Sequence, residues 1–141
     1  MSRQIIPPQQ ARVLVVEDDP NNRLVITKLL QLAGVPAGNI FAIESDVSNY
    51  LQAHPPGSID LILLDLRLPR KDGYAILSEL RADPSLADIQ IVALTANVMR
   101  SDILRAQAAG FDGFIGKPID GQRFPAMLRD ILAGQSIWPV T

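Results

Sequence analysis

The sequence contains no cysteine among its 141 residues. A chain without cysteine has no disulfide framework, no thiolate metal site and no cysteine nucleophile. It also lacks an excess of positive charge, because its formal net charge is -2. A surface that binds nucleic acid or an anionic membrane needs a basic patch or stripe, so the charge balance favours neither class of partner.

Long apolar runs are missing as well. No stretch of the sequence is long and apolar enough to cross a bilayer. The first ten residues lack the apolar core of a signal peptide. A cytoplasmic protein fits these absences. With 141 residues, of which 48% are hydrophobic and 20% charged, the chain is expected to form one globular domain with a substantial core.

Apolar stretches alternate with amphipathic ones along the chain. Val13–Val16 is continuously apolar and rich in β-branched residues, which is typical of a strand buried on both faces of a parallel sheet. Asp19 is expected to cap a helix that begins at Pro20. The alternation predicts an α/β fold, in which helices cover both faces of a parallel sheet. Five strands are expected over residues 13–16, 40–43, 60–64, 89–94 and 114–116, and five helices over residues 20–33, 47–53, 74–81, 99–109 and 124–132.

The two ends of the chain are interpreted as tails. Residues 1–10 include Pro7–Pro8 and are expected to be extended. Residues 135–141 form the second tail, in which Trp138 is expected to be disordered, with a partner contact as the alternative. One domain is therefore expected over residues 11–134, without an output domain after it.

Polar residues stand where four of the five expected strands end. Glu17 and Asp18 follow the first strand, and Asp65 follows the third. Thr95 follows the fourth strand and Lys117 the fifth. Open parallel sheets bind their ligands outside the carboxyl ends of the strands, so these side chains are expected to meet at one edge.

The chemistry of this edge is set by its carboxylates. Carboxylates that lie close together repel one another unless a cation sits between them. Mg²⁺, or Mn²⁺ in its place, takes oxygen ligands, and the backbone carbonyl of Arg67 is well placed to supply one more. A lysine and a hydroxyl beside the metal can stabilise the oxygens of a transferring phosphoryl group. Because a carboxylate can attack phosphorus and become an acyl phosphate, the edge predicts phosphoryl transfer onto Asp65.

Each of these residues also has an ordinary structural interpretation. Asp65 alone would be a capping residue at the rim of the sheet, and Thr95 alone a strand-end hydroxyl. Lys117 alone would be a solvated lysine. Glu17 and Asp18 could be charges favoured by the dipole of the helix that follows them. Their shared edge is what favours the chemical interpretation.

The motifs at this edge are similar to those of the receiver domain of bacterial two-component response regulators. The resemblance covers about residues 12–133. The matching stretches are Val15–Pro20 with its acidic pair, Leu63–Asp65 with Pro69 and Gly73, Leu94–Ala96 with its hydroxyl, Phe114 at the aromatic switch position, and Lys117–Pro118, where the family has a cis peptide bond.

The resemblance implies a fold and a reaction. The fold is a five-stranded parallel sheet in the flavodoxin-like order 2-1-3-4-5, with five helices on its two faces. In the reaction, a histidine kinase or a histidine phosphotransfer protein supplies a phosphoryl group from a phosphohistidine to Asp65. Mg²⁺ would be bound by Asp18, Asp65 and the Arg67 carbonyl, with Glu17 acting partly through water.

The resemblance also implies a conformational switch. Thr95 and Lys117 would bind the phosphoryl oxygens, Thr95 would move inward, and Phe114 would turn to a buried rotamer. The changed surface of the fourth helix, fifth strand and fifth helix would then bind a downstream protein, pass the phosphoryl group on, or form a homodimer. Arg67 and Asn97 lie where the family tunes dephosphorylation.

The sequence therefore predicts a signalling module that catalyses only its own phosphorylation and dephosphorylation. One alternative is a receiver-like interaction domain that works without phosphorylation. Another is an aspartyl-phosphate phosphatase of the haloacid dehalogenase type. Such phosphatases typically need a second acid two residues after the nucleophile, where this chain has Arg67.

Overall fold

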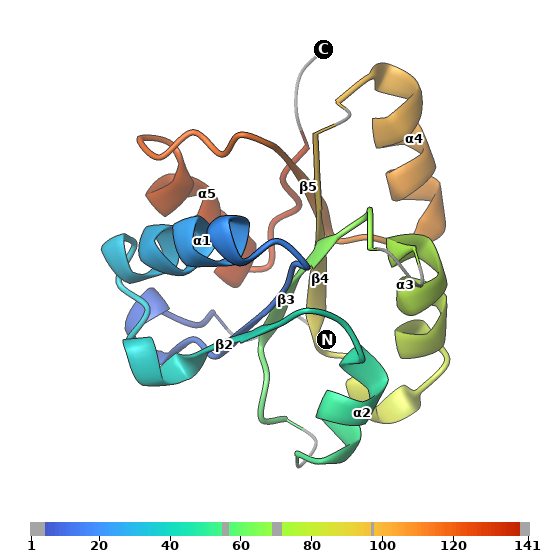
Figure 1. The fold of residues 1–141 in the computed structure, drawn as a ribbon, viewed down its shortest axis with the longest axis horizontal. Helices are drawn as coiled ribbons and strands as arrows, with labels where there is room; N and C mark the ends of the chain where they lie inside the picture. The colour runs from blue at the N-terminus through green and yellow to red at the C-terminus, as the bar shows by residue number, and fades with distance from the viewer. Residues whose placement is uncertain (1–4, 55–56, 69–71, 97, 139–141) are drawn as a thin grey trace.

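A parallel sheet forms the centre of the molecule (Figure 1). The computed structural model describes residues 5–54, 57–68, 72–96 and 98–138. In this part of the chain, five strands pair in the order β2-β1-β3-β4-β5, which confirms the predicted α/β fold and its flavodoxin-like strand order. The strands are β1 (Val13–Val16), β2 (Ile40–Ile43), β3 (Leu61–Asp65), β4 (Gln90–Thr95) and β5 (Gly113–Gly116).

Helices cover both faces of the sheet (Figure 1). α1 and α5 pack on one face, and α2, α3 and α4 pack on the other. No helix of the described residues is long and apolar enough to span a membrane. The α-helices are α1 (Pro20–Leu32), α2 (Val47–Gln52), α3 (Gly73–Arg81), α4 (Arg100–Ala109) and α5 (Phe124–Leu132), and the short 3-10 helices are η1 (Pro8–Gln10), η2 (Ala37–Asn39) and η3 (Pro84–Leu86).

The apolar strands lie at the centre of the sheet, where helices bury both of their faces. Every residue of β1, β3 and β4 is buried. Leu14 and Val16 of β1 pack in the cluster under α2, α3 and α4, whereas Val13 and Val15 pack under α1 and α5. Alternate strand residues point to opposite faces, so a strand without polar alternation must lie between two layers.

Short polar residues start two of the helices. The Asp19 side chain accepts a hydrogen bond of 2.8 Å from the Asn21 backbone N–H, which confirms the predicted cap of α1. Asp72 accepts one of 2.8 Å from the Ala75 N–H at the start of α3. Each cap satisfies a backbone donor that has no partner within the helix.

The N-terminal segment differs from the extended tail predicted for it. Residues 8–10 form η1, and the Ile6 N–H donates to the Leu132 carbonyl at 3.2 Å. Pro8 is buried, and Ile6 packs against the cluster under α1 and α5. The segment docks on the domain although it contains two prolines, because Ile6 and Pro8 bury apolar surface beside the end of α5.

The C-terminal segment also differs from its prediction. Trp138 is half-buried and packs against the core cluster under α2, α3 and α4, so the expectation of disorder is wrong for this residue. Ile137 forms a parallel bridge with Gly113 of β5. Residues 136–138 therefore lie along the edge of the sheet, with Ile137 and Trp138 partly buried against the domain and Ser136 exposed.

Candidate metal and phosphoryl site

Three carboxylates meet at the carboxyl edge of the sheet. Glu17, Asp18 and Asp65 each offer an oxygen, and these oxygens lie within 4.8 Å of one another. The register of β1 and β3 explains the meeting, because Val16 pairs with Leu64 and the next residues along both strands reach the same edge. Glu17 and Asp65 are 1% and 4% exposed, whereas Asp18 is open to solvent.

Lys117 supplies the positive charge at this edge. Its Nζ donates to Glu17 Oε2 at 2.6 Å and to Asp65 Oδ2 at 3.0 Å. Burial of the ammonium alone would lower the pKa of Lys117, but the hydrogen bonds and charges of Glu17 and Asp65 outweigh burial and raise it. The ammonium therefore stays charged, and three carboxylates against one lysine leave an excess of negative charge.

The loop after β3 fixes the other oxygen of Asp65. The Arg67 backbone N–H donates to Asp65 Oδ1 at 2.9 Å. Gly73 lets α3 begin close to the end of β3, because a Cβ there would lie 2.9 Å from the Leu66 Cα and 3.0 Å from the Asp65 carbonyl oxygen. A larger residue at this position would have to displace the backbone of Asp65 and Leu66.

Arg23 of α1 is a contact that the sequence did not predict. Its Nη1 donates to the backbone carbonyls of Glu17 at 2.8 Å and Asp18 at 3.1 Å. Its Nη2 lies 3.8 Å from the carboxylate of Glu44, which is largely exposed. Arg23 thus holds the backbone of the acidic pair in place. The signal was an arginine one turn into the helix that follows the acids.

Thr95 and Phe114 lie where their strands predict. Thr95 ends β4, is 3% exposed, and accepts a backbone hydrogen bond of 2.8 Å from the Lys117 N–H. Phe114 lies on β5 beside Ala93 and is only 1% exposed.

The peptide bond between Lys117 and Pro118 is cis, as the resemblance implied. Pro69 and Asn97 lie outside the described residues. The other residues predicted for the site lie within the described part of the chain: Glu17, Asp18, Asp65, Arg67, Thr95, Phe114, Lys117 and Pro118.

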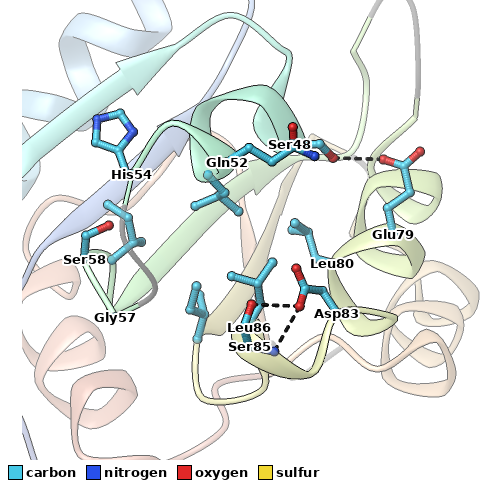
Figure 2. A pocket seen from close by; sticks show the side chains of 13 residues that line it. Ser48, Gln52, His54, Gly57, Ser58, Glu79, Leu80, Asp83, Ser85 and Leu86 are labelled. Carbon is cyan, nitrogen blue, oxygen red and sulfur yellow. Dashed lines mark hydrogen bonds between the residues drawn. The ribbon is translucent and has the colours of Figure 1, made fainter.

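A hollow of about 300 Å³ lies elsewhere, between α2, α3 and η3 (Figure 2). Its polar side chains contact one another: Ser48 Oγ donates to Glu79 at 3.3 Å, and Asp83 accepts from the backbone and hydroxyl of Ser85 at 3.0 and 2.7 Å. None of the residues at the carboxyl edge lines it. The hollow therefore has no part in the chemistry of that edge.

The donor set at the carboxyl edge fits a hard divalent cation. All three grouped ligands are carboxylates, which suit Mg²⁺ better than a softer metal. Asp18 faces solvent, so its carboxylate is accessible from outside the domain. The edge therefore offers the oxygen donors that such a cation takes.

Comparisons with known proteins agree with this geometry. The family model described as the response regulator receiver domain matches residues 13–129. Response regulator Rre1 of Synechocystis sp. is 32% identical over 87% of this chain. The chain covers 52% of Rre1 and so spans about half the length of that relative.

Solved structures show the same fold. The signal receiver domain of a signal transduction histidine kinase from Syntrophus aciditrophicus superposes with a TM-score of 0.74 at 26% identity, over 88% of this chain and 91% of that one. A second structure is the receiver domain of the sensor histidine kinase PA1611 from Pseudomonas aeruginosa PAO1, with a magnesium ion coordinated in its active site cleft. It superposes with a TM-score of 0.71 at 28% identity, over 89% of this chain and 98% of that one. With its sheet order, its acidic edge and the family match, this chain belongs to the response regulator receiver domains of two-component systems.

Proposed function

We propose that the chain is a phosphorylation-dependent switch in which Asp65 accepts the phosphoryl group. Receiver domains as a family serve phosphorylation-based signalling. The observation that carries the proposal is the position of Lys117, whose Nζ bridges Glu17 and Asp65 beside the open carboxylate of Asp18. A structural ion pair would need only one of these acids.

The acidic pair and Asp65 would hold the metal. Asp18 and Asp65 would bind Mg²⁺ or Mn²⁺ directly, with the Arg67 carbonyl as a further ligand and Glu17 acting partly through water. When bound, the metal supplies positive charge that lets Asp65 and the phosphoryl group approach each other. Arg23 would keep the backbone of the acidic pair in place throughout.

The transfer is a displacement at phosphorus. A carboxylate oxygen of Asp65 attacks the phosphoryl group of a phosphohistidine, the phosphorus–nitrogen bond breaks, and the donor imidazole leaves. Lys117 Nζ, now on Asp65 Oδ2, would follow the new charge onto a phosphoryl oxygen. The Thr95 hydroxyl would bind another oxygen, because Thr95 ends the strand beside β3.

The switch would be a shift in population. Phe114 is buried in this structure, and phosphorylation of Asp65 would increase the population of this buried rotamer. The surface formed by α4, β5 and α5 would then bind a downstream protein, pass the phosphoryl group on, or form a homodimer. The donor would be a histidine kinase or a histidine phosphotransfer protein in the cytoplasm.

Mass spectrometry tests the proposal. The chain is treated with acetyl phosphate and Mg²⁺, and the wild type should gain the mass of one phosphoryl group. Asp65→Asn should gain none. Asp60→Asn, which changes the aspartate just before the same strand, is the matched control and should gain the group normally. No gain in the wild type, or an equal gain in Asp65→Asn, would show that Asp65 is not the acceptor.

An interaction module that works without phosphorylation remains the competing function. It would keep the fold but have no need of a charged lysine between two buried acids. A partner complex of equal affinity with wild type and Asp65→Asn would favour this alternative. A phosphatase of the haloacid dehalogenase type is disfavoured, because Arg67 occupies the position of its second acid and is exposed.

A further inference from the structure

The segment Ser136–Trp138, which we name the C-terminal strap, runs along the outer edge of β5. Gly134, with a φ of 90°, turns the chain after α5, and the Gln135 N–H donates to the Asp130 carbonyl at 3.0 Å. The chain then returns parallel to β5. The Phe114 N–H donates to the Ile137 carbonyl at 2.8 Å, within the parallel bridge of Ile137 and Gly113.

The strap behaves as a strand in its packing as well as in its hydrogen bonding. Ile137 packs against the cluster under α1 and α5, whereas Trp138 packs against the cluster under α2, α3 and α4. Successive residues of a strand point to opposite faces in this way. Extending the Gly113–Ile137 register by one residue places Trp138 beside Phe114, and both residues belong on the same face.

The sequence of β5 is adapted to this neighbour. A Cβ on Gly113 would lie 3.2 Å from the Ile137 carbonyl oxygen and 3.4 Å from the Ile137 nitrogen. The first distance is tighter than most real Cβ contacts, so a side chain at position 113 would push the strap outward. Glycine is therefore the residue that lets the strap approach the backbone of β5.

We propose that the strap is a regulatory strand, and that its docking on β5 and the phosphorylation of Asp65 stabilise each other. The inference rests on the proposed function. The strap accepts the hydrogen bond of Phe114 and covers the same face with Trp138, so it favours the buried position of Phe114. Phosphorylation is proposed to favour that position too.

The covalent path between the two sites is short. β5 runs from Gly113 to Gly116 and leads directly into Lys117. The Lys117 N–H donates to the Thr95 carbonyl, and its Nζ bonds to Asp65. A shift of β5 toward or away from the strap therefore moves the backbone that carries Lys117. Coupling of this kind is reciprocal by thermodynamic necessity.

Trp138 is the only tryptophan of the chain, so its fluorescence reports on the strap directly. Without phosphorylation, Gly113→Ala should make Trp138 more accessible to acrylamide. The docking equilibrium of the strap should weaken about tenfold, which corresponds to a modest overpacking penalty. Gly38→Ala is the matched control, because a Cβ there meets nothing within 4 Å. Equal quenching in these two folded variants would overturn the docking of the strap.

The coupling is tested with the phosphorylated full chain. After acetyl phosphate and Mg²⁺, quenching of Trp138 should fall in the wild type and stay unchanged in Asp65→Asn. Mg²⁺ with beryllofluoride, a stable mimic of the phosphoryl group, should bind about fivefold more weakly to Gly113→Ala than to Gly38→Ala, at the lower end of typical couplings between sites.

The outcomes distinguish a failure of this inference from a failure of the proposed function. Unchanged quenching in a wild-type sample whose mass shows the phosphoryl group would overturn the coupling and leave Asp65 as the acceptor. A wild type that gains no mass would overturn both. Ile137→Ser removes the apolar packing of the strap and leaves the sequence of β5 unchanged. It replaces Gly113→Ala if the contact of position 113 with Val92, at 3.4 Å, prevents folding.

Discussion

Strand β3 has an aspartate at each end, and the two carboxylates are held in opposite ways. Asp60, just before the strand, is bound by Arg12: Oδ2 accepts from the Arg12 backbone N–H at 2.9 Å and from Nε at 3.1 Å, and Oδ1 accepts from Nη2 at 2.9 Å. The hydrogen bonds and charge of Asp60 outweigh the opposing effect of burial and raise the pKa of Arg12. This planar fork matches the carboxylate and fixes it.

Asp65, at the other end, is bound more loosely and in more crowded surroundings. One of its oxygens accepts from a lysine that is shared with Glu17, and the other accepts from the Arg67 backbone. A lysine ammonium is a point charge on a flexible stem, so it can move from one oxygen to another. The arginine fork thus holds Asp60 in a structural role, whereas Asp65 shares a mobile cation with another acid and stays available for chemistry.

Removing the shared cation should give the largest effect on stability. Lys117→Met leaves the buried Glu17 and Asp65 without their ammonium, and should lower the free energy of unfolding by about 2 kcal/mol without Mg²⁺. Because Mg²⁺ can then neutralise the same acids without competition, its affinity should rise. Urea unfolding with and without Mg²⁺ measures both effects. A variant as stable as the wild type in EDTA would contradict the shared-cation description.

The same variant should leave metal binding intact but separate phosphorylation from the switch. In Lys117→Met, beryllofluoride should no longer change the quenching of Trp138, although Mg²⁺ still binds. Lys28→Met, which removes an exposed lysine of α1, is the control. If Lys117→Met switched normally, the role given to Lys117 would be wrong, while that of Asp65 would stand.

At the opposite end of β3, Asp60→Asn should cost about 1 kcal/mol of unfolding free energy, because the pair with Arg12 is half exposed on the arginine side. Its phosphorylation should be unchanged. Asp65→Asn should show the reverse: no phosphorylation, but stability close to that of the wild type, because lost attraction to Lys117 is offset by lost repulsion from Glu17 and Asp18. Equal stability losses in the two variants would remove the distinction between the ends.

The alkaline limb of stability should report Lys117. A lysine with a raised pKa stabilises the fold fully below its unfolded pKa of 10.5, and this contribution is lost as the pH rises through the folded value. Burial also raises the pKa of Tyr50 and Tyr74, so their contribution to the free energy of unfolding likewise falls as the pH rises. Urea midpoints of the wild type and of Lys117→Met are compared at about pH 9 and about pH 11.5. The wild type should lose more stability over this range than Lys117→Met, and the difference is the contribution of Lys117.

The smallest effect is expected at Arg23. Arg23→Gln should weaken Mg²⁺ binding by about threefold, because the carbonyls of Glu17 and Asp18 lose a charged donor, while stability changes by less than about 0.5 kcal/mol. Isothermal titration with Mg²⁺ measures the affinity. Arg129→Gln, on the last turn of α5, is the control. An unchanged affinity would mean that Arg23 only supports the helix.

The sequence predicted what depends on periodicity and strand ends. Asp65 and Glu17 follow apolar runs, and parallel strands must bring such positions to one edge. Lys117 could be placed there for the same reason, and the resemblance supplied its role. Arg23 was missed because its contact depends on the rotamer of a side chain on a helix surface, which periodicity does not determine.

The two ends of the chain were predicted less well, for a physical reason. Pro7–Pro8 near the start of the chain, and Gln135, Ser136 and Pro139 near its end, are typical of tails, because composition describes only the local preference of a segment. Docking of Ile6 and Ile137 depends instead on apolar surfaces that only the folded domain presents. Long-range partners of this kind are not visible in a window of sequence.

The C-terminal strap has a consequence for how the protein behaves at high concentration. A strand at the edge of a sheet exposes backbone donors and acceptors that can pair with another molecule, and such pairing leads to aggregation. Ile137 occupies the donor of Phe114 at one edge of this sheet, while β2, at the other edge, is only four residues long. Both margins of the sheet are thus short segments, the strap beyond β5 and β2 on the other side, and short edges offer few backbone groups to another molecule.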